Sequence, residues 1–222
     1  MKIAFAGPSL YGAECDAGDV VMRGPAQMGD IDRAIADGAT AIGLIDGHYQ
    51  QVGAVWHKEI LLALSAGIAV FGAASMGALR AAECEPFGMI PIGQIATHYC
   101  SGELFDDADV ALTNGPAELG FPPLTEAMVD VEATLAHLVG SGLATQADAS
   151  SIAASGRSIF FADRTIEAIF EPLGAPGLYR LYVDNHVSQK TRDALALVET
   201  LKAWDDLDPE AAPWHIAALV AL

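Results

Sequence analysis

The sequence has few basic residues and no long apolar run. Its 11 Lys and Arg stand against 29 Asp and Glu in 222 residues, which gives a formal net charge of -18. Nucleic-acid binding needs Lys and Arg side chains that displace counterions from phosphates, so we expect no nucleic-acid partner. No stretch approaches the roughly 18 apolar residues of a membrane span, so we expect no membrane association.

Cysteine is scarce as well. Cys15, Cys84 and Cys100 are scattered and show no CxxC spacing, and the six histidines show no HExxH spacing. These patterns fit neither a disulfide framework nor a zinc site. We therefore expect reduced thiols, no metal and no cofactor.

The chain starts with MKIAFAGPSLYG, in which one Lys precedes a short apolar run interrupted by Gly and Pro. This start indicates a buried first strand rather than a signal peptide. Together with the absence of long apolar runs, it predicts a cytoplasmic protein. The oligomeric state stays open.

Residues 1–112 alternate short apolar runs with helical patterns, which is typical of an α/β fold with a mostly parallel sheet and short crossover helices. The expected strands are KIAFAG, DVVMRG, TAIGLID and IAVFGA, and Gly38 and Gly67 are expected to end the crossover helices. Over residues 113–222 helical periodicity takes over, as in PLTEAMVDVEATLAHLVGSG and NHVSQKTRDALALVETLKAW. We predict a core over 1–112 and a helical lobe over 113–222 packed on it, as two parts or one continuous domain. The closing PWHIAALVAL is expected to dock on the core.

Small and polar residues follow the predicted strands. Gly7 and Ser9 come after the first strand, Asp46 after the third, and residues 72–77 after the fourth. In an open α/β sheet, ligands bind at the carboxyl ends of the strands, and glycine lets the backbone approach a ligand closely. We expect these turns to line one cleft, with Gly7, Ser9 and Asp46 among its substrate-binding residues.

Ser75 lies at a predicted strand-to-helix turn in the string AASMG. This string differs from the hydrolase elbow GxSxG only in having Ala73 for the first glycine. Ser75 is a candidate nucleophile, and the N–H of Met76 at the start of a helix is a candidate oxyanion donor. The simpler alternative is that Ser75 is a helix N-cap.

Lys58 is the candidate base for Ser75. It is one of four lysines, and it stands among apolar residues at the start of a predicted helix. Burial there would favour the neutral amine, which can accept the serine proton. The alternative is a surface lysine whose stem covers apolar residues.

Two further residues have open roles. His57 is a candidate for hydrogen bonding to substrate, or it fills a half-buried structural position. Arg80 and Glu83 have the spacing of a helix pair, but Arg80 is equally a candidate to bind an anionic group at the helix start.

Longer strings resemble the TfuA family. They are IGLIDGHYQQVGAVWHKEILLAL and GIAVFGAASMGALRAAECEPFGM, with further agreement in FAGPSL, GQIATHYCSGELFDDADVA and PLTEAMVD. TfuA proteins are accessory to YcaO enzymes, which thioamidate peptide backbones. The resemblance implies a hydrolase that releases sulfide from the thiocarboxylated C-terminus of a ThiS-type sulfur carrier, with Ser75 and Lys58 as its catalytic pair.

Two other functions are open from the sequence. The chain is also a candidate for a non-catalytic adaptor that binds a YcaO-type enzyme and improves its hold on the peptide. A phosphate or nucleotide binder has less support, because neither GxxxxGK[ST] nor GxGxxG occurs.

Overall fold

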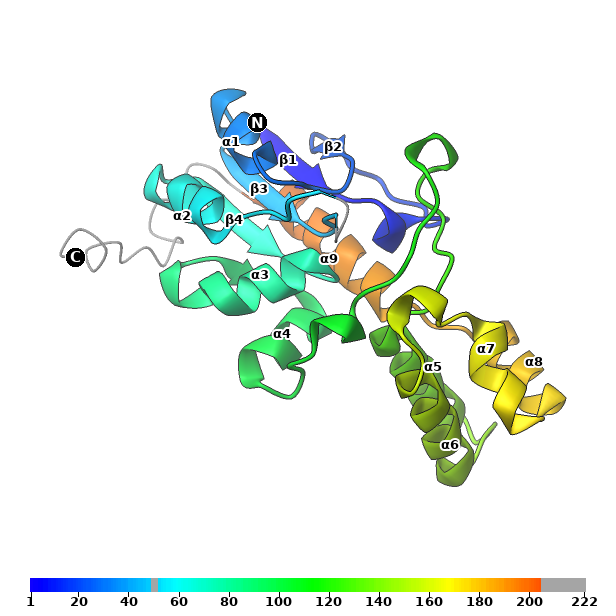
Figure 1. Ribbon diagram of the computed structural model, residues 1–222. Helices are drawn as coiled ribbons and strands as arrows, with labels where there is room; N and C mark the ends of the chain where they lie inside the picture. Colours follow the sequence, from blue (N-terminus) through cyan, green and yellow to red (C-terminus); the bar gives the residue numbers. More distant parts are fainter. Residues whose placement is uncertain (49–51, 205–222) are drawn as a thin grey trace. The chain divides into compact units, whose positions relative to one another are not determined.

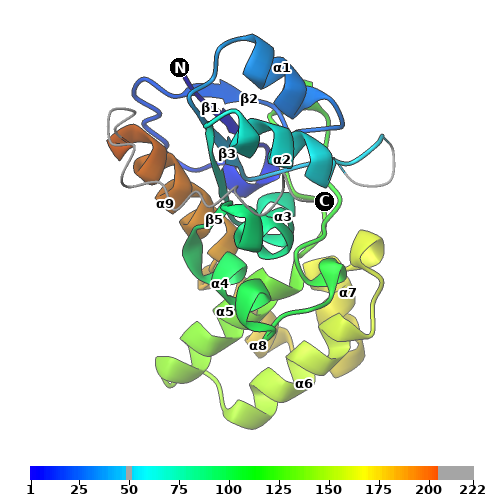
Figure 2. The same cartoon turned by 90° about the vertical axis from the view of Figure 1, so that its left-hand side faces the viewer.

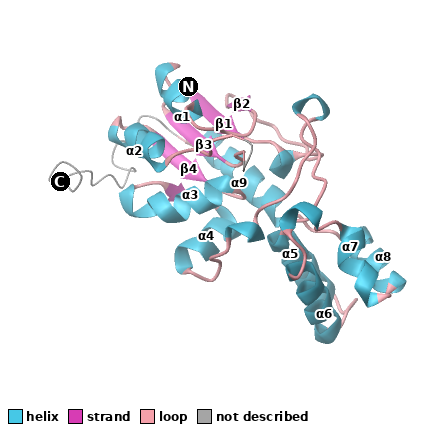
Figure 3. Ribbon diagram, in the orientation of Figure 1, coloured by secondary structure: helices cyan, strands magenta, loops and turns pink. Residues whose placement is uncertain are grey.

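A computed structural model describes residues 1–48 and 52–204, and it contains one parallel sheet and many helices (Figures 1 and 3). These residues fall into two compact units. The sheet unit comprises residues 1–105 and the described residues from Thr191 onward, and the helical unit comprises residues 106–190. The expected α/β class, with an N-terminal parallel sheet followed by helices, is confirmed. The segment PWHIAALVAL lies outside the described residues.

The sheet unit holds all five strands of the described chain. The strands are β1 Lys2–Phe5, β2 Val21–Arg23, β3 Ala41–Leu44, β4 Ala69–Gly72 and β5 Ile90–Pro91. Its helices are α1 Asp30–Ala36, α2 His57–Ser65, α3 Met76–Cys84, α4 Gly93–Ser101 and most of α9 Gln189–Ala203. Across the described residues, no helix is both long and apolar enough to cross a membrane.

The sheet is fully parallel, in the order β2-β1-β3-β4-β5. All four predicted strands are present, and Gly38 and Gly67 follow α1 and α2 with positive φ, as expected for helix stops. Strand β5 has no counterpart among the predicted strands, because its two residues are too few to produce a pattern. In a sheet of this order, the direction of strand addition reverses between β1 and β3, which is where ligands are commonly bound.

Chain connectivity decides which helices cover each face of the sheet. The crossovers through α1, α2 and α3 all step the same way across the sheet, so right-handed connections place the three helices on one face. The β1–β2 connection steps the other way, but it contains only the short 3-10 helix Pro8–Leu10. Helix α9 covers that second face instead (Figure 2).

Helix α9 packs closely on the sheet because the strand residues beneath it are small. Ala4 and Ala41 share a buried cluster with Leu197 and Leu201 of α9. A Cβ atom on Gly43 would lie 2.4 Å from Leu197 Cδ2, so the glycine permits the approach. The predicted range 113–222 is therefore divided in the structure, because α9 packs with the sheet while residues 106–190 form their own unit.

The helical unit is a group of short helices around a core of its own. Its helices are α5 Met128–Gly140, α6 Gln146–Arg157, α7 Ile166–Phe170 and α8 Pro176–Asp184. Val131, Leu138, Ile152 and Tyr182 are buried together in this core. The periodicity that predicts a helix in PLTEAMVDVEATLAHLVGSG corresponds to α5.

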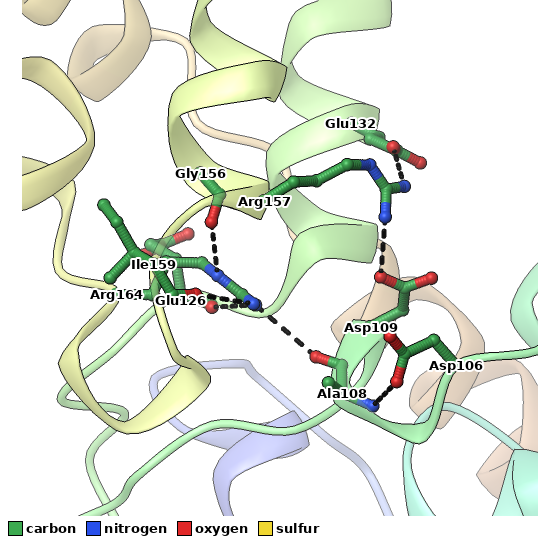
Figure 4. A network of polar contacts seen from close by, with 9 residues as sticks. All are labelled: Asp106, Ala108, Asp109, Glu126, Glu132, Gly156, Arg157, Ile159 and Arg164. Carbon is green, nitrogen blue, oxygen red and sulfur yellow. Dashed lines mark hydrogen bonds and ion pairs between the residues drawn. The ribbon is translucent and has the colours of Figure 1, made fainter.

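Two arginines hold the loops of the helical unit (Figure 4). Arg164 is buried and donates hydrogen bonds to four backbone carbonyls, including that of Gly156 at 3.0 Å. Arg157 pairs with Asp109 at 3.1 Å and with Glu132. Because buried polar groups need partners, the Arg164 contacts satisfy carbonyls that have no other partner in a regular helix or strand of the described chain, and the Arg157 pairs join the loop at Asp109 to α5.

Asp130 is a buried carboxylate in the same unit. It accepts the Lys190 N–H at 2.9 Å and the Ser188 hydroxyl at 3.1 Å, while the Lys190 ammonium group donates to Val110 O at 2.8 Å. Burial raises the pKa of Asp130 to about 6, although the nearby charge of Lys190 opposes the shift. Native Asp130 therefore holds its proton to a higher pH than Asp130 of the unfolded chain.

This shift predicts a pH dependence of stability. A raised carboxyl pKa stabilises the native state most below about pH 4, and that stabilisation, on the order of 3 kcal/mol, is lost as pH rises to about 6. Asp130→Asn cannot ionise, so the free energy of unfolding of wild type relative to Asp130→Asn should fall between pH 4 and pH 7. Urea unfolding across this range measures the difference, with the exposed Asp163 changed to Asn as the control. A difference that stays flat with pH would contradict the prediction.

Candidate functional site

The turns that follow the strands lie together at the carboxyl edge of the sheet. Backbone hydrogen bonds join Ala26 N–H to Asp46 O at 2.9 Å and Gly77 N–H to Ile45 O at 3.1 Å, and His48 N–H donates to Ala26 O at 2.9 Å. The turns after β2, β3 and β4 are thus directly bonded to one another. Their expected gathering at one edge is confirmed, while the cleft itself stays a prediction.

Asp46 ties the turn after β1 to the turn after β3. Its carboxylate accepts the N–H of Gly7 at 2.8 Å, the N–H of Ser9 at 3.0 Å and the hydroxyl of Ser9 at 2.7 Å. Asp46 and Ser9 are 1% and 2% exposed. A buried carboxylate with three donors is well compensated, so Asp46 acts here as a clamp on the GPSL turn.

The clamp uses the amide groups of the GPSL turn. Gly7 and Ser9 donate to Asp46, Pro8 has no N–H, and Leu10 N–H donates to Gly7 O at 3.0 Å. Each N–H of this turn therefore has a partner within the chain. A substrate-binding role for Gly7, Ser9 and Asp46 stays a prediction, and in this structure the three residues bind one another.

The turn before Ser75 has an unusual backbone. Ala74 has φ +63°, and Ser75 N–H donates to Ala73 O at 2.7 Å, which makes a γ-turn around Ala74. Positive φ is uncommon for residues other than glycine, and such strain concentrates at functional sites. The string AASMG gives no hint of this strain, because a glycine would be expected at a position with positive φ.

Ser75 occupies the N-cap position of α3 without capping it through its side chain. Its backbone carbonyl accepts the N–H of Ala78 at 2.9 Å, but its hydroxyl makes no hydrogen bond with any residue in 1–48 or 52–204. Ser75 is only 5% exposed. Because buried hydroxyls normally have a partner, this one is available to a ligand rather than used by the fold.

Two buried N–H groups flank Ser75. Neither Ala74 N–H nor Met76 N–H donates to another residue of the described chain, although both residues are buried. Orphaned buried N–H groups are rare, and those at a helix start attract negative charge. The predicted role of Met76 as an oxyanion donor is compatible with this arrangement, and Ala74 is a second candidate donor, which the string AASMG does not predict.

Glycines bring α3 against the ends of β3 and β4. A Cβ atom on Gly77 would lie 1.7 Å from Leu44 O, and one on Gly72 would lie 2.2 Å from Gly77 O. Both contacts involve backbone atoms, which side-chain movement cannot relieve. The glycine that ends AASMG is therefore required by packing.

Lys58 is exposed, so of the two alternatives left open by the sequence, the structure contains the surface lysine. It is the second residue of α2, and the buried lysine of the chain is Lys190 of the helical unit. Its apolar neighbours in the sequence do not bury it, because Ile60 and Leu64 are buried on a helix face that Lys58 does not share. Whether Lys58 pairs with Ser75 stays a prediction.

His57 and Arg80 connect α2 to α3. Arg80 Nε donates to Val55 O at 2.9 Å, and Arg80 Nη1 pairs with Glu83 Oε2 at 2.6 Å. His57 Nε2 lies 2.8 Å from the same Glu83 oxygen. Of the two roles open for Arg80, the structure contains the helix pair. Substrate binding by His57 or Arg80 stays a prediction.

The described residues contain no group of three or more His, Cys, Asp and Glu side chains placed to hold a metal ion. Cys84 is buried, and burial raises the pKa of its thiol to about 11. A thiol with a raised pKa is a poor nucleophile at neutral pH. In the described turns at the carboxyl edge, the Ser75 hydroxyl is a buried nucleophilic group without a hydrogen-bond partner.

The Asp46 clamp generates a prediction about stability. Asp46→Ala leaves the N–H groups of Gly7 and Ser9 buried without an acceptor, so it should lower the free energy of unfolding by roughly 2–5 kcal/mol. Ser9→Ala removes one donor and leaves the carboxylate two others, so it should cost about 1 kcal/mol. Urea unfolding of both variants measures the contrast. Equal losses in the two variants would show that Asp46 is not the clamp.

Comparison with known proteins places the chain in a family. The family model described as TfuA-like protein matches residues 46–165, which is 120 of the 222 residues and includes Lys58 and Ser75. No curated protein matches the chain. The matched region overlaps the strings from IGLIDGHYQQVG to PLTEAMVD that carry the resemblance. The chain belongs to the TfuA-like protein family.

Proposed function

We propose that this protein hydrolyses the thiocarboxylated C-terminus of a ThiS-type sulfur carrier and so supplies sulfide to a YcaO-type enzyme that thioamidates a peptide backbone. Membership of the TfuA-like family supports a role in peptide thioamidation. The observation that carries the proposal is the Ser75 hydroxyl, which is buried and has no hydrogen-bond partner among the described residues.

The surroundings of Ser75 support a nucleophilic role. Ser75 stands at the positive end of the α3 dipole, and the N–H groups of its sequence neighbours Ala74 and Met76 are unengaged among the described residues. Fixed donors of this kind stabilise the negative oxygen that develops when a nucleophile attacks a carbonyl. The strained turn at Ala74 and the packing of Gly77 hold these groups in place before substrate arrives.

The proposed reaction needs water as its only co-reactant. Ser75 Oγ bonds to the thioacid carbon, and its proton passes to the neutral amine of Lys58. The C–S bond then breaks, and sulfur leaves with that proton as hydrosulfide. In the second step, water attacks the Ser75 ester and its oxygen bonds to the carbonyl carbon while the bond to Ser75 Oγ breaks. One water proton restores the serine hydroxyl, and the other is released to solvent as the carrier leaves as its carboxylate.

Lys58 is the proposed base because of the family resemblance and its position. Helix α2 packs against α3, the helix that begins next to Ser75. Lys58 also has no hydrogen bond or ion pair with any other residue that the structure describes. A cation at the second residue of a helix is unfavourable by about 0.3–1 kcal/mol, so this lysine does not serve the stability of α2.

The first test removes the nucleophile. Ser75→Ala should reduce sulfide release from a thiocarboxylated carrier by at least on the order of 1,000-fold, because the covalent route is lost. Sulfide release under single-turnover conditions measures the effect. Ser65→Ala is the control, since this exposed hydroxyl bonds to Leu62 O at the far end of α2.

The same variant distinguishes hydrolysis from the adaptor role. An adaptor should still improve peptide modification by the YcaO-type enzyme when Ser75 is alanine and sulfide is supplied. Full sulfide release by Ser75→Ala, with the fold intact by circular dichroism, would refute the proposed hydrolysis.

The second test concerns the base. Lys58→Ala should lower kcat for sulfide release by about 100-fold or more, because a general base contributes on that scale. Steady-state rates at saturating carrier measure it. The control is Lys202→Ala, which removes a lysine paired with Asp16 and Glu199 on α9. An unchanged kcat for Lys58→Ala would exclude this lysine as the base while leaving the nucleophile untouched.

A further inference from the structure

Large apolar side chains are exposed around the start of α2. Met28 is 44% exposed, Val52 is 44% exposed and Trp56 is 56% exposed. These three residues, called the Trp56 patch below, lie before α1 and α2 rather than inside the core. A single exposed apolar residue needs no explanation, but a group that includes Trp indicates an interaction surface.

Hydrogen bonds hold the members of the Trp56 patch together. Met28 N–H donates to Gly53 O at 2.8 Å, so the two loops run side by side. The buried Glu59 carboxylate accepts Gly29 N–H at 2.8 Å and Trp56 N–H at 3.3 Å. The backbone beneath the Trp56 patch is therefore fixed, which lowers the entropy cost of binding a partner there.

The Trp56 patch lies at the same sheet edge as Ser75. In a parallel sheet with crossover helices, the residues that precede α1, α2 and α3 all follow strand ends, so they share the carboxyl edge. Gly47 lies between the two regions. A Cβ atom built on Gly47 would lie 2.7 Å from Met76 Cγ, next to Ser75, and 3.2 Å from the carbonyl oxygen of Ala26, which is two residues before Met28. A partner seated on the patch would thus be close to the Ser75 turn.

Charge at the Trp56 patch differs from charge on the chain as a whole. The net charge is -18, yet Lys58, two residues after Trp56, has no ion pair among the described residues. Two neighbouring carboxylates are engaged, since Glu59 binds backbone N–H groups and Glu83 pairs with Arg80 and His57. Asp32 on the first turn of α1 is exposed and has no ion pair among the described residues, so the patch is flanked by one free charge of each sign.

We propose that the Trp56 patch forms the docking surface for the folded body of the sulfur carrier, which presents an apolar face to it. This inference rests on the proposed function, because the carrier is the partner whose tail must reach Ser75. A small thioacid would need only the Ser75 turn, whereas exposed Trp and Met side chains suit the centre of a protein interface. Docking beside the site would deliver the tail at high effective concentration.

Binding and turnover together test the docking surface. The probe is a ThiS-type carrier ending in Gly-Gly, used as its carboxylate for calorimetric binding and as its thiocarboxylate for sulfide release. Trp56→Ala should weaken binding by about 10-fold or more and raise KM similarly, with kcat changed less than about 3-fold. Met28→Ser should act in the same direction. The control is Phe87→Ala, an aromatic residue 42% exposed at the opposite edge, after α3, where carrier affinity should be unchanged.

The two proposals fail separately. If wild type releases sulfide but Trp56→Ala and Met28→Ser keep wild-type affinity and KM, the docking surface is refuted and the hydrolysis stands. If wild type releases no sulfide but both variants weaken carrier binding, the docking surface stands and the hydrolysis is refuted. Failure of wild type to bind the carrier, or loss of YcaO-type enzyme binding alone in the variants, overturns the docking inference.

Discussion

The contact between the start of α3 and the end of β3 is the constraint on which the candidate site depends. Gly77 donates its N–H to Ile45 O, and its Cα lies so close to Leu44 O that no side chain fits. To begin the helix this close to the neighbouring strand, the chain has only three residues in which to turn after Gly72. Ala74 takes up the turn with a positive φ. Ser75 is then held at the N-cap position with its hydroxyl unused, which is an arrangement that the fold does not need for itself.

Topology explains why the candidate site lies at this edge of the sheet. The single reversal in strand addition lies between β1 and β3, and the turns after both strands are joined by Asp46. The β1–β2 connection contains no α-helix, so one sheet face depends on α9 from the far end of the chain. Phe71 of β4 packs edge to face on Trp204 just beyond α9, with ring centroids 5.1 Å apart. Helices α2 and α3 contact β4 from the opposite face, so the strand that leads to Ser75 is held on both faces, which favours a rigid site over a mobile one.

The sequence predicts this architecture to the extent that local pattern encodes it. Four strands, the helix stops at Gly38 and Gly67, and the strand-to-helix turn at Ser75 follow from apolar runs and glycines. The sequence does not predict that α9 covers one face of the sheet, because the packing of α9 on Gly43 joins distant parts of the chain and leaves no local pattern. The start of α1 is another example. Asp is a residue type that often caps helices, yet Gly29 is the N-cap and Asp30 is the first residue of α1. Asp46 was expected to line a cleft, and in the structure its carboxylate holds the GPSL turn. Its partners lie 37 and 39 residues away in the sequence, so no local pattern predicts these bonds.

Lys58 is the residue whose proposed role depends most on a partner. Its apolar neighbours leave burial and exposure both open, and the helix start leaves it exposed, two residues after Trp56 and without an ion pair among the described residues. Removing water from an amine disfavours its charged form, so a lysine that must act as a base needs a cover. In the proposed complex, a carrier seated on the Trp56 patch would supply that cover as its tail reaches the Ser75 turn. The exposed lysine and the exposed tryptophan then have one proposed explanation, which is that the partner covers both.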